Sequence, residues 1–332
     1  MPEPLVQRQP SRAMVIAAFA AVYVLWGSTY LAIRFAIETL PPFLMAGARF
    51  VTAGAILYAW ARWRGAARPS RVEWRSSFLT GGLLFLGGNG AVVWAQQYVP
   101  SGVAALLVAT EPMWLVLIAS LASGSRPHGR IVAGLALGFA GVTILIGPGE
   151  ILGSGRVHLA GAAVLVFGAF SWAAGSLYSR GAKMPANPAM ATALTLLGGG
   201  ALLFVASAVR GEPFGFDPAA VSAGSLAALL YLVTAGSLVG FTAYLWLLRV
   251  STLARVSTYA YVNPVIAVLL GALLAGEALT PRVALAAAVI VGAVALIITA
   301  RARREEDALE DALDVEPEPE LAEEVPRRSA SL

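Results

Sequence analysis

The chain of 332 residues is 58% hydrophobic and 13% charged, whereas soluble domains are about 45–50% apolar and about 25% charged. So few charges could not cover the surface of a soluble fold, which excludes that class. The formal net charge of +4 combines an acidic end, with eleven acids and two arginines in 305–332, and a basic remainder. Cysteine is absent, which excludes disulfides and thiolate metal sites.

Long apolar stretches follow one another along most of the chain and predict membrane-spanning helices. A stretch of about twenty residues crosses the hydrocarbon layer, and a helix pairs its own backbone groups where lipid offers no partner. The first stretch is long for a secretory signal, and no clean cleavage site follows it. Ten spans are expected, at 14–36, 43–61, 77–96, 101–122, 130–147, 158–179, 187–209, 223–248, 254–276 and 281–300.

The basic residues predict the orientation of these spans. If the N-terminus is cytoplasmic, 18 of the 23 Lys and Arg residues fall in cytoplasmic segments. The opposite face receives Arg34, Arg156, Arg210 and Arg282, while Arg49 lies inside a span. Cytoplasmic loops of membrane proteins carry such an excess of positive charge. Both termini are therefore expected in the cytoplasm, and loop charge of this kind does not indicate nucleic acid as a partner.

The two ends of the chain lie outside the predicted spans. Residues 1–13 form a short cytoplasmic N-terminus, and residues 301–332 are rich in Glu, Asp and Pro with little to bury. This composition is typical of a disordered cytoplasmic tail. A regulatory or partner-binding role and a solvated tail without a specific role both fit it.

A weak internal repeat divides the membrane part in two. The matches, in order, are Trp26 with Trp172, Arg34 with Arg180, Pro42 with Pro188, Trp94 with Trp246, Pro112 with Pro264, Leu121 with Leu273, Gly124 with Gly276 and Arg130 with Arg282. They define a first five-helix repeat at 14–147, a periplasmic linker at 148–157 and a second five-helix repeat at 158–300. Five is an odd number, so the second repeat enters the membrane upside down.

The expected fold is therefore all-α, with ten transmembrane helices in two inverted five-helix repeats around a central cavity. Inverted repeats are the architecture of many secondary transporters, whose substrate site lies between the halves near the middle of the membrane.

Pro112 and Pro264 fall near the middle of their spans. Proline removes a backbone hydrogen bond and pushes against the carbonyl four residues earlier, which belongs to Val108 in one span and Ala260 in the other. Inside a membrane those carbonyls need a partner, so both helices should bend beside protein, water or substrate. Paired kinks facing a cavity and structural kinks packed against neighbours remain alternatives.

The order of short motifs resembles the EamA-type branch of the drug/metabolite transporter superfamily, especially its YedA-like exporters. The motifs are LWGSTY (25–30), MAGARF (45–50), GNG (88–90), VPSGVAA (99–105), YAYVNPV (259–265) and GEALT (276–280). The resemblance extends over roughly 14–300 and implies a basket-like bundle with a central cavity lined mainly by spans 1, 3, 4, 6, 8 and 9. It also implies export of amino acids, metabolites or drugs without ATP.

Two residues depart from what the resemblance implies. Ser125 stands where the second repeat has Glu277, so the two corresponding loops differ. Glu111 occupies a mid-span position where a neutral residue is expected, which leaves the charge of the substrate and the coupling ion open.

Two charged side chains are expected inside the membrane. Glu111 lies about ten residues into its span and Arg49 about six into another, so their depths differ by roughly 6 Å. A charge within a span usually faces the bundle interior, finds a partner or accepts a proton. One hypothesis is a structural Arg49–Glu111 ion pair; the other is that Glu111 faces the cavity and binds a cationic substrate or a coupling proton.

Polar and aromatic residues that share helical faces form the candidate substrate-binding set. They could build an aromatic cage with a few hydrogen-bonding groups, suited to an amphipathic or cationic ligand. Alternatively, they serve helix packing or the aromatic belt at the membrane surface. The set comprises Trp26, Tyr30, Asn89, Gln96, Glu111, Trp114, Trp172, Ser176, Tyr244, Tyr259 and Asn263.

No motif of an ATPase or a hydrolase is found in the sequence. The chain has no Gly-Lys pair, which excludes a Walker A phosphate loop, and neither His-Glu-x-x-His nor Gly-x-Ser-x-Gly occurs. We expect no cofactor and no metal ion.

The predicted function is a secondary active exporter or facilitator in the inner membrane, which moves a small-molecule substrate by alternating access, with protons as a candidate coupling ion. A channel, a non-transporting membrane scaffold and a polytopic membrane enzyme are the alternatives.

Overall fold

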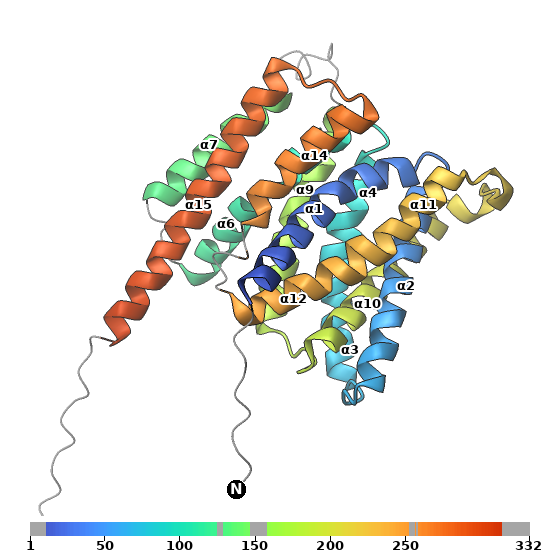
Figure 1. The fold of residues 1–332 in the computed structure, drawn as a ribbon, viewed down its shortest axis with the longest axis horizontal. Coiled ribbons are helices and arrows are strands. Elements are labelled where there is room, and N and C mark those ends of the chain that lie inside the picture. The colour runs from blue at the N-terminus through green and yellow to red at the C-terminus, as the bar shows by residue number, and fades with distance from the viewer. Residues whose placement is uncertain (1–10, 125–128, 147–157, 252–255, 257, 314–332) are drawn as a thin grey trace, which may run out of the picture.

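The structure, a computed structural model, describes residues 11–124, 129–146, 158–251, 256 and 258–313. All regular secondary structure in these ranges is helical (Figure 1). The predicted linker at 148–157, most of the predicted N-terminal segment, Ser125 and the tail beyond residue 313 lie outside the described residues.

The helices follow the predicted spans in order, and some spans consist of two or three helices joined end to end. Eight helical stretches are long and apolar enough to cross a membrane, and Gly129–Leu145 and Tyr259–Ala275 are shorter apolar helices. The α- and π-helices are α1 (Arg12–Ala36), α2 (Pro42–Trp63), α3 (Arg71–Gly81), η1 (Gly82–Asn89), α4 (Gly90–Ala95), α5 (Ser101–Val108), α6 (Glu111–Ser123), α7 (Gly129–Ile146), α9 (Leu159–Gly181), α10 (Pro188–Val209), α11 (Ala223–Tyr231), η4 (Leu232–Val239), α12 (Gly240–Val250), α14 (Tyr259–Ala275) and α15 (Pro281–Leu313).

The last helix is longer than the sequence analysis predicts. α15 runs to Leu313, so residues 301–313 are helical where a disordered tail was expected. Their sequence, RARREEDALEDAL, is rich in Arg, Ala, Leu and Glu, which are among the strongest helix formers. The disorder prediction, which rested on charge and on the lack of apolar residues, does not hold for this stretch.

Two matched glycines end helices in the two halves of the chain. Gly124 follows α6 and Gly276 follows α14, with φ values of 65° and 63°. Glycine adopts this left-handed conformation without the steric penalty that other residues meet, and it therefore often ends helices. The internal sequence match of Gly124 with Gly276 thus corresponds to the same backbone role in each half.

A π-helical segment interrupts the third predicted span of each half. η1 and η4 are both eight residues long, and they begin 150 residues apart, at Gly82 and Leu232. The i→i+5 hydrogen bonding of a π-helix shifts the faces on which later side chains point, and such segments are frequent at functional sites. The structure therefore has the same irregularity at corresponding places in the chain.

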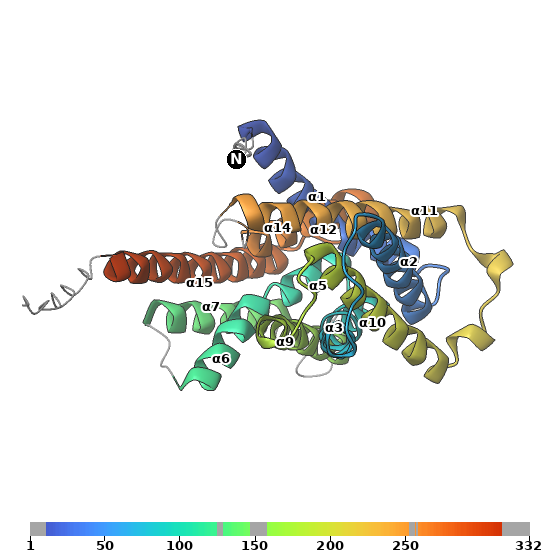
Figure 2. The same ribbon diagram turned by 90° about the horizontal axis from the view of Figure 1, so that it is seen from below.

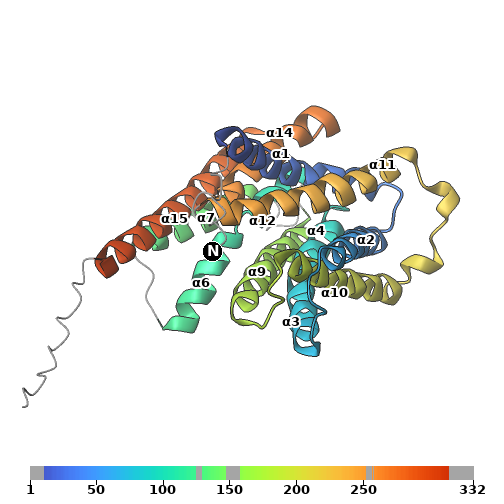
Figure 3. The same cartoon turned by 60° about the horizontal axis from the view of Figure 1, so that its bottom comes forward.

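Helices of the first half pack against helices of the second. α2 lies beside α10, α1 beside α14 and α7 beside α15, and the views in Figures 1, 2 and 3 agree that the α7–α15 pair stands apart from α2, α3 and α10. Gly81 allows a close approach of α3 to α10, because a Cβ there would lie 2.4 Å from the Thr195 carbonyl oxygen. The main hydrophobic core accordingly contains residues of both halves.

Candidate functional site

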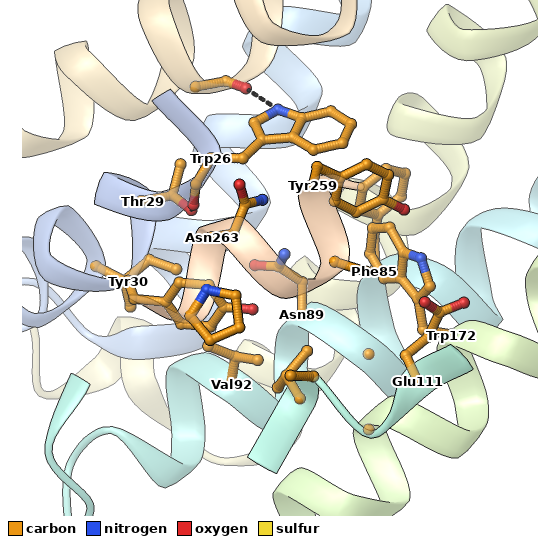
Figure 4. Close-up of a pocket in the computed structure, with 18 of the residues that line it drawn as sticks. Trp26, Thr29, Tyr30, Phe85, Asn89, Val92, Glu111, Trp172, Tyr259 and Asn263 are labelled. Atoms are coloured by element: carbon orange, nitrogen blue, oxygen red, sulfur yellow. Dashed lines mark hydrogen bonds between the residues drawn. The ribbon is translucent and has the colours of Figure 1, made fainter. Parts of the chain in front are cut away.

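A cavity of about 140 Å³ lies between helices of both halves (Figure 4). One water needs about 10–15 Å³ of such space, so the cavity has room for several waters or a small organic molecule. All six spans implied by the resemblance contribute to its wall, and so does α2. Seven of the eleven predicted binding residues line it, namely Trp26, Tyr30, Asn89, Glu111, Trp172, Tyr259 and Asn263.

Gln96 and Trp114 were predicted in the binding set and do not line this cavity. Gln96 is buried at the end of α4. The Trp114 ring packs against Phe139 and Phe170, with ring centres 5.6 Å apart in both cases. Their side-chain nitrogens are buried without a hydrogen-bond partner in the described part of the chain. Helical spacing predicts a shared face, but it does not fix how far along the axis a cavity extends.

Ser176 and Tyr244 also lie outside the cavity wall. The Ser176 hydroxyl donates to the Trp172 carbonyl oxygen at 2.9 Å, one turn back in its own helix. The Tyr244 ring packs against Trp26 and Tyr259, with centres 5.2 and 6.0 Å away. Tyr244 therefore supports rings that do line the cavity.

Pro112 and Pro264 line the cavity. So do Val108 and Ala260, whose carbonyls were predicted to lose a hydrogen bond to the prolines. In the first half, α5 ends at Val108 and α6 begins at Glu111, so the helix is interrupted just before Pro112. In the second half, Pro264 lies inside the continuous helix α14, four residues after Ala260. The two matched prolines thus share a position on the wall but differ in how far they disrupt the helix.

One part of the wall is an aromatic cluster centred on Trp26. The indole nitrogen of Trp26 donates to the Gly236 carbonyl oxygen at 3.2 Å, as the dashed line in Figure 4 shows. Its ring centre lies 5.3 Å from Phe241 and 5.2 Å from Tyr259. The cluster therefore joins α1 of the first half to η4, α12 and α14 of the second.

Phe85 extends this aromatic wall to the other helices. Its ring centre lies 4.4 Å from Phe50 and 5.9 Å from Trp172. Phe50, Phe85 and Phe241 were not predicted as wall residues, because phenylalanine is inconspicuous in a chain so rich in apolar residues. The only available signal was spacing, since Phe85 precedes Asn89 by one helical turn.

The two charged residues predicted inside the membrane line the same cavity. Arg49 is only 5% exposed; its Nε donates to the Ser237 hydroxyl at 3.1 Å, and its guanidinium carbon lies 4.7 Å from the centre of the Phe50 ring. Glu111 and Trp172 are both among the residues that line the cavity (Figure 4). η4 packs against α2, and the Ser237 hydroxyl thus accepts a hydrogen bond from the Arg49 guanidinium.

Two amide side chains on the wall have buried oxygens without partners. Oδ1 of Asn89 and Oδ1 of Asn263 accept no hydrogen bond within the described ranges. An unsatisfied buried acceptor costs about 1–3 kcal/mol. A rearrangement or a ligand that supplies a donor would remove this cost.

Small residues pack tightly between α5 and α14, next to the part of these helices that lines the cavity. Ala104 and Ala105 of α5 and Ala267 of α14 are almost wholly buried. A Cβ on Gly102 would lie 3.0 Å from Val268, so the start of α5 nearly touches α14. Ala104 and Ala105 thus lie between the start of α5 and Val108, which lines the cavity.

Glu277 caps the start of α5. Its carboxylate accepts hydrogen bonds from the Ser101 backbone N–H and hydroxyl, both at 2.7 Å, and from the Gly102 N–H at 2.9 Å. Arg34 adds an ion pair at 3.3 Å. α5 follows a proline and has no side-chain cap of its own, so a carboxylate from the second half satisfies N–H groups at the start of a first-half helix.

Comparison with protein families identifies two matching stretches. The profile described as "EamA-like transporter family" matches residues 13–147 and residues 159–299. Together these matches cover most of the chain.

Curated relatives carry transporter names. "Uncharacterized inner membrane transporter YedA" of Escherichia coli K12 is 39% identical over 284 residues, which cover 85% of this chain and 90% of that protein. "Probable amino-acid metabolite efflux pump" of the same strain is 27% identical, covering 78% of this chain and 86% of its own length. A solved crystal structure covers 86% of this chain and 98% of its own with a TM-score of 0.58 at 22% identity, which shows a shared fold.

Proposed function

The chain belongs to the EamA-like transporter family, and on this premise we propose that it is a secondary active exporter or facilitator of small metabolites, amino acids or drugs. It works in the inner membrane by alternating access and without ATP. The names of its relatives, an inner membrane transporter and an amino-acid metabolite efflux pump, support transport rather than catalysis.

The observation that carries this proposal is the cavity whose wall is built by residues of both halves. Ten spans in two inverted repeats explain why π-segments and terminal glycines recur at corresponding places. Two halves of similar construction can exchange conformations around a central site, which is the basis of alternating access.

The distribution of basic residues supports an orientation with both termini in the cytoplasm. In agreement with this, the start of α1 and the end of α15 lie toward the same end of the bundle (Figure 1). The end of the bundle where Glu277 caps α5 then faces the periplasm, and the packed layer of small residues lies on that side of the cavity. Tags placed after Arg68 and after Arg180 should be accessible from the same side, and accessibility from opposite sides would refute the ten-span topology.

Counterflow in proteoliposomes tests the transport function. A thermal-shift screen against amino acids, metabolites and amphipathic cations first identifies a ligand of the purified protein. A carrier should then show saturable uptake that is stimulated by unlabelled ligand on the opposite side. Uptake without saturation or counterflow would indicate a channel, and the absence of uptake would indicate a scaffold.

We assign to Glu111 the binding of the substrate's cationic group or of a coupling proton, because an acid on a cavity wall within the membrane can do either. In Glu111→Gln, transport should lose its dependence on the pH gradient or its preference for cationic substrates. Glu38→Gln changes an exposed acid and serves as the matched control. Unaltered proton dependence and unaltered substrate preference in Glu111→Gln would reject the assignment.

A further inference from the structure

Arg49 is a buried cation whose hydrogen-bonding partner on the protein is neutral. Its side chain lies on the cavity wall, and its Nε donates to the hydroxyl of Ser237, which is itself only 1% exposed. A guanidinium has five N–H donors. The hydroxyl of Ser237 occupies one of them, and the other four belong to the terminal nitrogens.

The charge of Arg49 is not neutralised within the described ranges. The ion pair found there joins Arg34 to Glu277, and the remaining close partner of Arg49 is the face of the Phe50 ring. Removing a cation from water without a counter-charge costs several kcal/mol, so such a group is stable beside a cavity that admits water or an anion.

Gly236 provides the space that the guanidinium occupies. A Cβ at this position would lie 3.3 Å from Nη2 of Arg49 and 3.0 Å from Cγ2 of Thr29. Gly236 and Ser237 are neighbours in η4, so the π-segment supplies both the space and the hydroxyl that orients the side chain. The guanidinium is therefore held in place by a neutral partner, with Nη2 close to Gly236, which also lines the cavity.

We infer that Arg49 binds the anionic group of the substrate and that this carrier selects small organic carboxylates with an apolar or aromatic body. The inference rests on the proposed transport function. A planar carboxylate matches two guanidinium N–H groups at once. The aromatic wall formed by Trp26, Phe85 and Tyr259 accommodates the apolar body, and the presence of Glu111 on the same wall disfavours ligands with two negative charges.

Pairs of ligands that differ only in having a carboxylate or a primary amide test the inference. The purified full-length chain is titrated with phenylacetate and phenylacetamide, and with L-phenylalanine and L-phenylalaninamide, while intrinsic tryptophan fluorescence is recorded. The wild type should bind each carboxylate more tightly than its amide. Arg49→Gln should lower the affinity for the carboxylates by about tenfold or more and leave the affinity for the amides unchanged, and Arg49→Lys should retain part of the preference.

A merely structural role of Arg49 would change binding of both members of a pair alike. The inference is overturned if the wild type binds no carboxylate of the panel, if it does not discriminate, or if Arg49→Gln keeps the wild-type ratio while eluting as the same monodisperse species. Arg49-dependent carboxylate binding without counterflow would refute the transport function and leave the site intact. If Arg49→Gln shows the same counterflow as the wild type, the carboxylate site at Arg49 is refuted and the transport function stays intact.

Discussion

Replacing Glu277 by alanine should destabilise the bundle more than replacing any exposed acid. The Glu277 side chain is 8% exposed, whereas that of Arg34 is 37% exposed, so the ion pair itself contributes about 0–1 kcal/mol. The larger loss comes from two backbone N–H groups and one hydroxyl that would remain without their acceptor. Each unsatisfied group costs about 1–3 kcal/mol, and such costs are not fully additive for neighbouring groups. The free energy of unfolding should therefore fall by about 3–5 kcal/mol in total.

Thermal unfolding of the purified protein in detergent measures this effect. With about 2–4 °C for each kcal/mol, the melting temperature of Glu277→Ala should fall by at least about 6 °C. Glu277→Gln should be intermediate, because one amide oxygen can still accept from Ser101 while the amide nitrogen cannot accept from Gly102. Glu38→Ala removes an exposed acid and should melt like the wild type. If Glu277→Ala also melts within about 1 °C of the wild type, the capping argument is wrong.

Two further substitutions test packing and capping in the same assay. Glu212→Ala removes a carboxylate that accepts hydrogen bonds from the Leu44 N–H and the Ser207 hydroxyl, both at 2.8 Å. The substitution should lower the free energy of unfolding by about 1–2 kcal/mol, as loss of a helix cap does. An unchanged melting temperature would contradict this. Gly81→Ala places a methyl group 2.4 Å from a carbonyl oxygen of α10 and should cost about 1–3 kcal/mol or more through overpacking. Its control is Gly181→Ala, where a Cβ meets nothing within 4 Å, so equal melting of the two variants would reject the argument.

The sequence was sufficient to predict where the apolar helices lie, because span length and hydrophobicity are local properties. It also predicted that Gly124 and Gly276 occupy equivalent places, and both prove to be left-handed helix ends. Local reasoning failed at residues 301–313, where a prediction of disorder from charge overlooked the helix propensity of the same residues.

Much less of the candidate site could be predicted. Trp26 and Asn263 were chosen from spacing and do line the cavity, but the same argument selected Gln96 and Trp114, which do not. Spacing defines a helical face, whereas the depth and rotation of a helix depend on all its neighbours. The π-segments alter this rotation within a span, and no pattern in the sequence analysis indicated them.

The amino-acid sequence by itself determined the membrane class, the approximate helix boundaries and the unequal distribution of positive charge, because each follows from composition over a short window. Only the tertiary structure decided which polar groups meet. Ser101 and Glu277 are 176 residues apart in the chain, and Arg49 and Ser237 are 188 residues apart. Such contacts depend on how separate helices are placed against one another in space, which no local stretch of sequence specifies.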